Sequence, residues 1–169
     1  LIGVCGSQDA STVTKICAHF YKLHNAYVGL SNQLGLSFNQ RVVDRYMDSE
    51  WESGRKTIMN PMVDVAIVES TPREILMQGI PYDLCSVGVV TGIDLEQFYP
   101  DESIVEERQL FSIYRTQIDV VLPNEGVAVI YAETSMAKEL AEISPSEVMF
   151  YSVSPDHELI VEWQKKNMR

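Results

Sequence analysis

Long apolar runs and an excess of basic residues are both missing from this sequence. No apolar stretch approaches the roughly 20 residues that a membrane-spanning helix needs. Lys and Arg together number 13 against 24 Asp and Glu, so the net charge is −11. Because nucleic-acid phosphates are bound by clustered basic side chains, nucleic acid is excluded as a partner. A membrane surface is excluded as well, because no basic amphipathic helix is visible.

Cysteine and histidine are also scarce and show no metal-binding spacing. The three cysteines are far apart, and each lies in an apolar pattern, so we expect buried thiols in a reducing, cytoplasmic compartment. Two of the three histidines fall five residues apart on one expected helix, where they point in different directions. No metal site is therefore expected from the set Cys5, Cys17, Cys85, His19, His24 and His157.

Strand and helix patterns alternate along the chain, which is typical of a parallel sheet covered by helices. With 46% apolar residues, the chain has enough core for one domain. We predict an α/β fold with a doubly wound, mostly parallel sheet and helices on both faces, similar to P-loop NTPases. Strands are expected at 1–6, 26–31, 63–69, 85–91, 127–131 and 148–153, with a hairpin within 32–47. Helices are expected at 11–25, 48–59, 71–79, 102–118 and 136–143.

The two ends of the sequence indicate how the chain is divided into domains. The sequence has no initiating methionine and starts inside an apolar strand, so we expect it to be part of a longer chain. One domain is predicted over residues 1–155, and 156–169 is predicted to begin a following segment.

The segment GVCGSQDASTVT, residues 3–14, stands where a nucleotide-binding protein has its phosphate loop. Such a loop uses glycines, a lysine for the phosphate charge and a Ser or Thr hydroxyl for Mg²⁺. Here Gly6 and the Ser11-Thr12 pair remain, but Ala10 stands at the lysine position and Asp9 at a glycine position. Losing the cation and gaining a carboxylate should weaken triphosphate binding by several kcal/mol, or about a thousandfold. Helix capping by Asp9 or Ser11 would equally explain these residues.

Two further strand ends carry carboxylates, where ligands of open parallel sheets bind. Glu69 ends a buried strand, a common place for a Mg²⁺ ligand, although it could instead bond N–H groups of the next helix. Asp94 is a weaker version of the same case. Thr71, Pro72 and Glu74 form a helix-start pattern with an N-cap, a proline and a capping-box glutamate. Met47, Met59, Met62 and Met77 are expected to pack internally.

Residues 60–93 resemble the Mur-ligase-type central domain of the cyanophycin synthetase family. The family has the pattern N-P-x-V-D-x-A followed by Glu, and later D-x-C before a VGVVT strand. This chain keeps the VGVVT strand and the family's residues at Asn60, Pro61, Val63, Asp64, Ala66, Glu69, Ile75, Leu76, Gly79, Asp83 and Cys85. A weaker match extends over nearly the whole chain. The resemblance implies a domain that uses ATP and Mg²⁺ to activate a carboxylate and join an amine to it. It also implies neighbouring ATP-grasp and C-terminal ligase domains as partners.

The resemblance also shows where this chain departs from the family. The family's G-T-N-G-K-T-T corresponds to Gly6, Ser7, Gln8, Asp9, Ala10, Ser11 and Thr12, without the lysine. Other family-equivalent crevice positions are Gly92, Asp94, Tyr131 and Glu133, and none keeps the family's residue pattern. Glu69 is the main catalytic position retained, with Ser11 as a second Mg²⁺ ligand if the domain is active.

Three hypotheses follow. The first is a catalytically silent domain that acts as a scaffold, forms a homo-oligomer or holds polymer, with no bound cofactor of its own. The second is a divergent ligase that still binds ATP and Mg²⁺ through Ser7, Ser11 and Glu69, with a lysine such as Lys15. The third is a regulator whose crevice, with Asp9, Glu69 and Asp94, binds a cationic ligand such as arginine.

Overall fold

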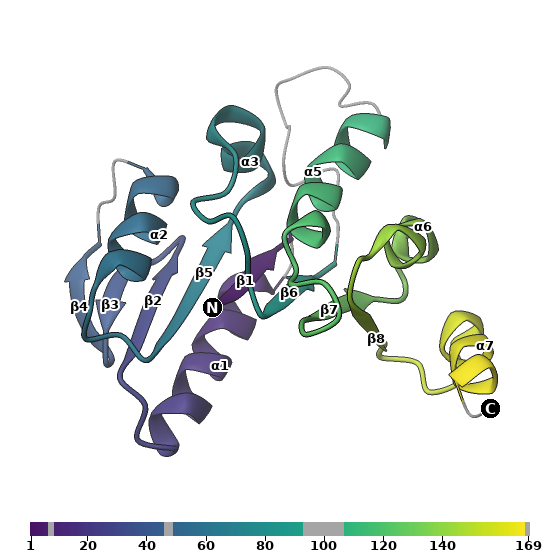
Figure 1. Ribbon diagram of the computed structural model, residues 1–169, viewed down its shortest axis with the longest axis horizontal. Helices are drawn as coiled ribbons and strands as arrows, with labels where there is room; N and C mark the ends of the chain where they lie inside the picture. The colour runs from purple at the N-terminus through teal and green to yellow at the C-terminus, as the bar shows by residue number, and fades with distance from the viewer. Residues whose placement is uncertain (7–8, 46–48, 93–106, 168–169) are drawn as a thin grey trace.

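The computed structural model describes residues 1–6, 9–45, 49–92 and 107–167. Its strands form one eight-stranded sheet in the order β4-β3-β2-β5-β1-β6-β7-β8 (Figure 1). The strands are β1 (Ile2–Cys5), β2 (Val28–Asn32), β3 (Gly35–Phe38), β4 (Arg41–Asp44), β5 (Val65–Ser70), β6 (Val87–Val90), β7 (Val127–Tyr131) and β8 (Glu147–Tyr151). The helices are α1 (Ala10–Leu23), α2 (Glu50–Met59), α3 (Pro72–Gln78), α5 (Glu107–Asp119), α6 (Ala137–Ile143) and α7 (Glu158–Asn167).

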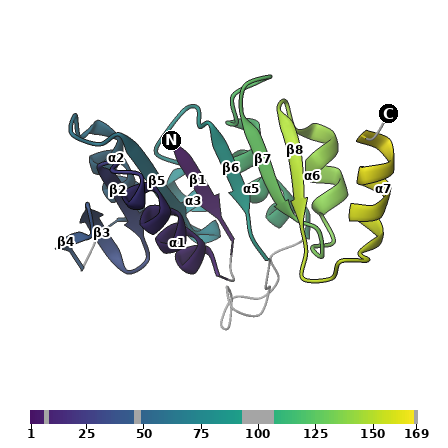
Figure 2. The ribbon, with the colours of Figure 1, turned by 90° about the horizontal axis from the view of Figure 1, so that it is seen from below.

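The predicted fold class is confirmed. The six neighbouring strands β2, β5, β1, β6, β7 and β8 all pair in parallel. At the other edge, β3 and β4 form a hairpin that pairs antiparallel with β2. Helix α1 covers one face, and α2, α3, α5 and α6 cover the other (Figures 1 and 2). Every residue of β1 is buried, because a central parallel strand is covered on both sides. The hairpin within 32–47 is confirmed by β3 and β4.

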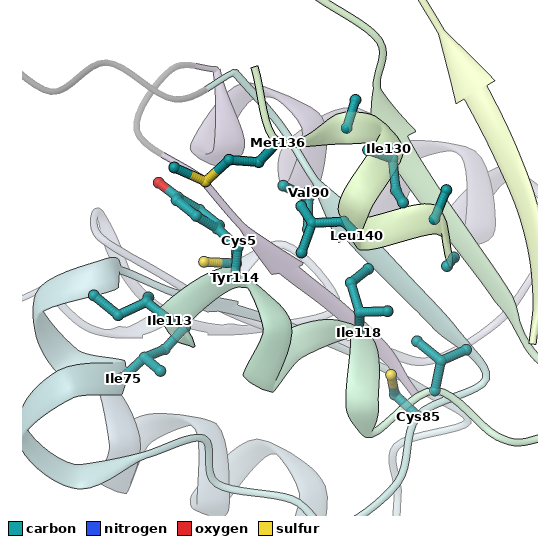
Figure 3. Packing of buried hydrophobic residues seen from close by; sticks show 14 of the residues in the cluster. Cys5, Ile75, Cys85, Val90, Ile113, Tyr114, Ile118, Ile130, Met136 and Leu140 are labelled. Atoms are coloured by element: carbon teal, nitrogen blue, oxygen red, sulfur yellow. The ribbon is translucent and has the colours of Figure 1, made fainter. Parts of the chain in front are cut away.

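Two hydrophobic clusters lie on the two faces of the sheet. The larger one joins β1, β6 and β7 to α5 and α6, with Tyr114, Ile118 and Leu140 fully buried (Figure 3). The smaller one lies beneath α1 and contains Val4, Ile67 and Val89. Cys5 and Cys85 are buried as predicted, but Cys17 is only half-buried, because it lies at the side of α1 rather than beneath it.

The large apolar residues of α1 do not face the sheet. Ile16, Phe20 and Leu23 are 49%, 58% and 64% exposed, while the buried positions are Ala10, Thr14 and Ala18. Small side chains at this i, i+4, i+8 spacing let the helix lie close to the sheet.

The methionine prediction was wrong for the residues the structure describes. Met59, Met62 and Met77 are between 66% and 72% exposed, because they lie at the ends of short helices and in a turn. Met47 lies outside the described residues.

The C-terminal elements agree with the expected order. The described part of α5 ends at Asp119, near the expected end, and its predicted start at 102 lies outside the described residues. Helix α7 packs on β8 through a perpendicular contact between Phe150 and Trp163, whose ring centroids are 5.0 Å apart. The domain boundary at residue 155 stays a prediction. Among the described residues, no helix combines the length and apolarity needed to cross a bilayer.

Candidate functional site

The chain reverses direction across the sheet at β1, which lies between β5 and β6. In open α/β sheets, this switch point opens a crevice beyond the carboxyl ends of the strands. The ends of β1, β5 and β6 therefore meet at one edge, and α1 starts there. The hydroxyl of Thr91, directly after β6, fills the space beside Gly6, since a Cβ on Gly6 would lie 1.8 Å from Thr91 Oγ1.

The loop before α1 keeps an unusual backbone at Asp9. Its φ of 59° and ψ of 0° put it in the left-handed region, which glycine occupies without strain and Asp tolerates better than most residues. This is the position where the sequence pattern expects glycine. The predicted loop residues Ser7 and Gln8 lie outside the described residues, and Thr12 is exposed to solvent.

The capping prediction was wrong for both candidates. Asp9 occupies the N-cap position of α1, but its side chain makes no capping hydrogen bond, because the left-handed backbone is not the extended one that capping residues adopt. Ser11 does not cap either. Its hydroxyl points across to β5, where it donates to Glu69.

Ser11 and Glu69, which were predicted together as Mg²⁺ ligands of an active domain, lie in contact. The Ser11 Oγ is 2.7 Å from Oε2 and 3.0 Å from Oε1 of Glu69, and the Gln33 amide donates to Oε1 at 3.0 Å. Glu69 is 1% exposed. Burial raises the pKa of the Glu69 carboxyl, the hydrogen bonds from Ser11 and Gln33 oppose that shift, and the nearby carboxylate of Glu50 adds to it.

Glu50 and Glu74 are part of this edge and were missed as site neighbours from the sequence. Glu50 accepts a hydrogen bond from the Thr71 backbone N–H at 3.1 Å, and burial raises the pKa of its carboxyl. Glu74 reaches the Ser49 hydroxyl at 3.0 Å rather than its own helix start. Thr71 does accept from Glu74 N, so the N-cap is confirmed, but the reciprocal half of the predicted capping box is made by Glu50.

A cavity of about 240 Å³ opens on the other side of Asp9. The rings of Tyr131 and Tyr151 lie at its wall with centroids 5.2 Å apart and planes tilted by 37°. Among the described residues, its lining is Asp9, Val13, Thr91, Gly92, Tyr131, Tyr151 and Val153. Tyr151 and Val153 were not predicted as site residues, because residues 148–153 have the sequence pattern of an ordinary strand.

Glu133 holds the wall of this cavity in place. It accepts hydrogen bonds from the Tyr131 hydroxyl at 2.6 Å, the Ser152 hydroxyl at 2.7 Å and the Val153 N–H at 3.2 Å. These hydrogen bonds lower the pKa of the Glu133 carboxyl, the one from Tyr131 most and the one from Ser152 next. Burial is the largest cause that raises the pKa of Tyr151 to about 12, and the charges of Tyr131 and Asp9 contribute less.

Of the remaining predicted residues, only Gly92 is shown to be part of this arrangement. Gly92 is buried and lines the cavity, whereas Asp94 lies outside the described residues. Lys15, the alternative phosphate ligand, lines a different cavity between α1 and the β3–β4 hairpin. Within the described residues, no group of three or more His, Cys, Asp or Glu side chains could hold a metal ion.

The fold is that of Mur ligases and folylpolyglutamate synthases. A structure of UDP-N-acetylmuramoyl-L-alanyl-D-glutamate–2,6-diaminopimelate ligase matches 92% of this chain, and 32% of its own, with a TM-score of 0.70 and 12% identity. Mycobacterium tuberculosis folylpolyglutamate synthase, solved with ADP, matches 88% of this chain and 41% of its own with a TM-score of 0.60 and 13% identity. Both likenesses concern the fold.

The curated proteins that are similar in sequence to this chain are cyanophycin synthetases. The cyanophycin synthetase of Crocosphaera subtropica is 25% identical over 161 residues, which is 95% of this chain. That of a Synechocystis species is 26% identical over 168 residues, or 99% of this chain. No family model matches. The chain is thus a relative of the cyanophycin synthetases with a Mur-ligase-like fold, as its motifs indicated, and it spans 18% to 19% of the length of these two relatives.

Proposed function

We propose that this chain is a Mur-ligase-like domain that keeps the ligase fold but does not bind a nucleotide at its phosphate loop. The observation that carries the proposal is Ala10, which stands at the lysine position and is buried with 3% exposure in the cluster beneath α1. A methyl group packed in a core offers no charge to a phosphate. The preceding residue, Asp9, places a carboxylate at the loop instead.

The size and charge of the crevice support the same conclusion. Its volume of about 240 Å³ is below the range of roughly 300–1,000 Å³ that ligand pockets usually have. Two like charges about 4 Å apart repel by a few kcal/mol at a surface-like dielectric. A triphosphate would thus meet repulsion where the family pattern has attraction.

The Ser11–Glu69 pair fits Mg²⁺ only in part. A carboxylate and a hydroxyl are oxygen ligands of the kind Mg²⁺ takes, but proteins usually hold this ion together with substrate phosphates. Here the single hydroxyl proton of Ser11 is shared between the two Glu69 oxygens, and the Gln33 amide donates to one of them, so hydrogen bonds already hold the carboxylate. We therefore assign it a structural role between α1 and β5.

The role we propose is that of a scaffold or polymer-holding domain in a cyanophycin-synthetase-related protein of the cytoplasm. ATP-grasp and C-terminal ligase domains of such a protein, and a second copy of the domain, are its proposed partners. The ATP-dependent chemistry would then belong to those other domains.

Calorimetry with ATP and Mg²⁺ tests the proposal. Wild-type protein should show no binding at the loop up to about 1 mM nucleotide, and the double variant D9G/A10K should gain affinity by about tenfold or more. The matched control D83N/A10S changes an exposed acid at the opposite edge and adds no cation. Micromolar binding by wild-type protein would favour the divergent-ligase hypothesis instead.

A cationic ligand is a second candidate, favoured by the cavity lining. That lining contains Asp9 and two tyrosine rings, and no Lys, Arg or His. A guanidinium group could pair with the carboxylate and stack on the rings. Argininamide should then bind more tightly than citrulline amide, whose ureido side chain is uncharged, and D9N should remove the difference while D83N keeps it. Equal binding of both amides would refute this candidate.

A further inference from the structure

A second cavity, of about 350 Å³, lies between α1 and the edge hairpin and has the opposite charge character. Figure 2 shows the hairpin strands β3 and β4 at one edge of the sheet, on the side where α1 lies. The lining is Lys15, Ala18, His19, Lys22, Val28, Leu30, Ser37, Asn39 and Gln40. No Asp or Glu is among these residues, although the whole chain carries a net charge of −11.

The basic residues converge because of helical spacing. Lys15, His19 and Lys22 follow one another at i, i+4 and i+7 on α1 and therefore share one face. The side chains of Lys15 and Lys22 both line the cavity. In the part of the chain that the structure describes, the two ion pairs are Glu52–Lys56 and Arg115–Asp119, so neither Lys15 nor Lys22 has a carboxylate partner there.

The hairpin turn that closes the cavity is strained. Asn39 and Gln40 both have positive φ, 47° and 70°, as the two central residues of a tight hairpin turn require. Asn accepts this conformation readily, but Gln does so rarely. The Lys22 ammonium donates to the side-chain oxygen of Gln40, so the turn is tied to the last turn of α1. Strain of this kind tends to occur where a binding surface is built.

We propose that this cavity binds a small oxyanion with an apolar body, either a carboxylate or a phosphate monoester. The ammonium groups of Lys15 and Lys22 and the hydroxyl of Ser37 would face the anionic group. Ala18, Val28 and Leu30 give the floor an apolar surface for the rest of the ligand. The volume lies within the usual range for small-molecule sites, unlike that of the crevice.

The proposal is independent of the nucleotide question, but the two must be separated experimentally, because ATP is itself an oxyanion. Binding of ATP by wild-type protein that is lost in K15Q/K22Q would belong to this cavity, because these two lysines line it. Binding that depends on residues 9–11 alone would overturn the function proposed for the loop and leave this inference unaffected.

An NMR titration of isotopically labelled protein tests the inference. The probes are phenyl phosphate, benzoate and neutral benzyl alcohol, at up to about 10 mM, which covers weak sites. We expect one or both anions to shift amides in α1, β3 and the turn, and benzyl alcohol to shift them much less. The anion that binds identifies the preferred group. Raising the salt concentration should weaken binding.

Charge-removing variants complete the test. K15Q and K22Q should each weaken binding by about threefold to fivefold, and K15Q/K22Q by about tenfold. K56Q, which removes the same charge from α2, should change it less than twofold. Equal affinities of K15Q/K22Q and K56Q, or no anion binding to wild-type protein, would overturn the proposal. Circular dichroism establishes that each variant is folded, and the salt dependence of wild-type binding needs no variant.

Discussion

The Ser11 hydroxyl lies 2.7 and 3.0 Å from the two carboxylate oxygens of Glu69, and this contact joins the start of α1 to the end of β5. These are the two residues that the family resemblance assigns to Mg²⁺. In this chain they bond each other, inside a largely buried edge of the sheet. Several predictions about the loop and its neighbours rest on this geometry.

Replacing Ser11 with alanine should destabilise the fold. Glu69 is 1% exposed and would lose its shortest hydrogen bond, keeping only Gln33 among the donors described above. A buried charged acceptor left short of a partner costs about 1–3 kcal/mol. Urea unfolding at pH 7 measures this loss. S11T keeps a hydroxyl and should lose less than half as much, and a loss below about 0.5 kcal/mol in S11A would contradict the structural role of the pair.

Stability should increase as the pH falls from 7 towards about 5. The pKa values of Glu69 and Glu50 are raised in the folded protein, mainly by burial, so the folded state binds more protons than the unfolded state between the unfolded and folded pKa values. The penalty for these charges is present above the folded pKa and disappears as pH falls to the unfolded value. E69Q should reduce this dependence, as measured by urea unfolding at both pH values. An unchanged slope in E69Q would show that Glu69 is not its source.

Replacing Asp9 with glycine should stabilise the protein. The left-handed backbone at φ 59° strains any residue with a Cβ, and glycine removes that strain at the cost of greater freedom in the unfolded chain. We expect a net gain of about 0.5–1 kcal/mol. D9A should lose stability instead, because Ala tolerates this conformation less well than Asp. Thermal unfolding compares the three proteins, and a gain in D9A equal to that in D9G would show that strain at residue 9 is not the cause.

Local sequence patterns were sufficient to predict most strands of the sheet and the order of strands and helices. The boundaries of β7 were predicted to the residue, and Thr71 and Pro72 marked the start of α3 correctly. These features depend on nearby residues: a buried strand needs a run of apolar side chains, and a helix start needs a cap. The fold class followed from their alternation.

The face of α1 was not predictable from periodicity alone. Two sets of residues in α1 recur at helical spacing. The set with the larger apolar side chains, which includes Phe20 and Leu23, faces outward. The set of Ala10, Thr14 and Ala18 packs inward because small side chains allow close contact with the strands. Which set is buried depends on the strands below, and these are distant in sequence.

The surroundings of the site depend on similar distant contacts. Gln33 reaches Glu69 across 36 residues, and Glu50 reaches Thr71 across 21. Tyr131 and Tyr151 meet because β7 and β8 pair in register. No local pattern marks such partners, so the sequence indicated the candidate residues but not their assembly.

A crystal structure of the protein soaked with a non-hydrolysable ATP analogue and Mg²⁺ would show directly whether the loop binds nucleotide. We expect no nucleotide density around residues 6–12, with the Ser11–Glu69 hydrogen bonds intact. Density for a triphosphate enclosed by that loop, with Mg²⁺ between Ser11 and Glu69, would contradict this expectation.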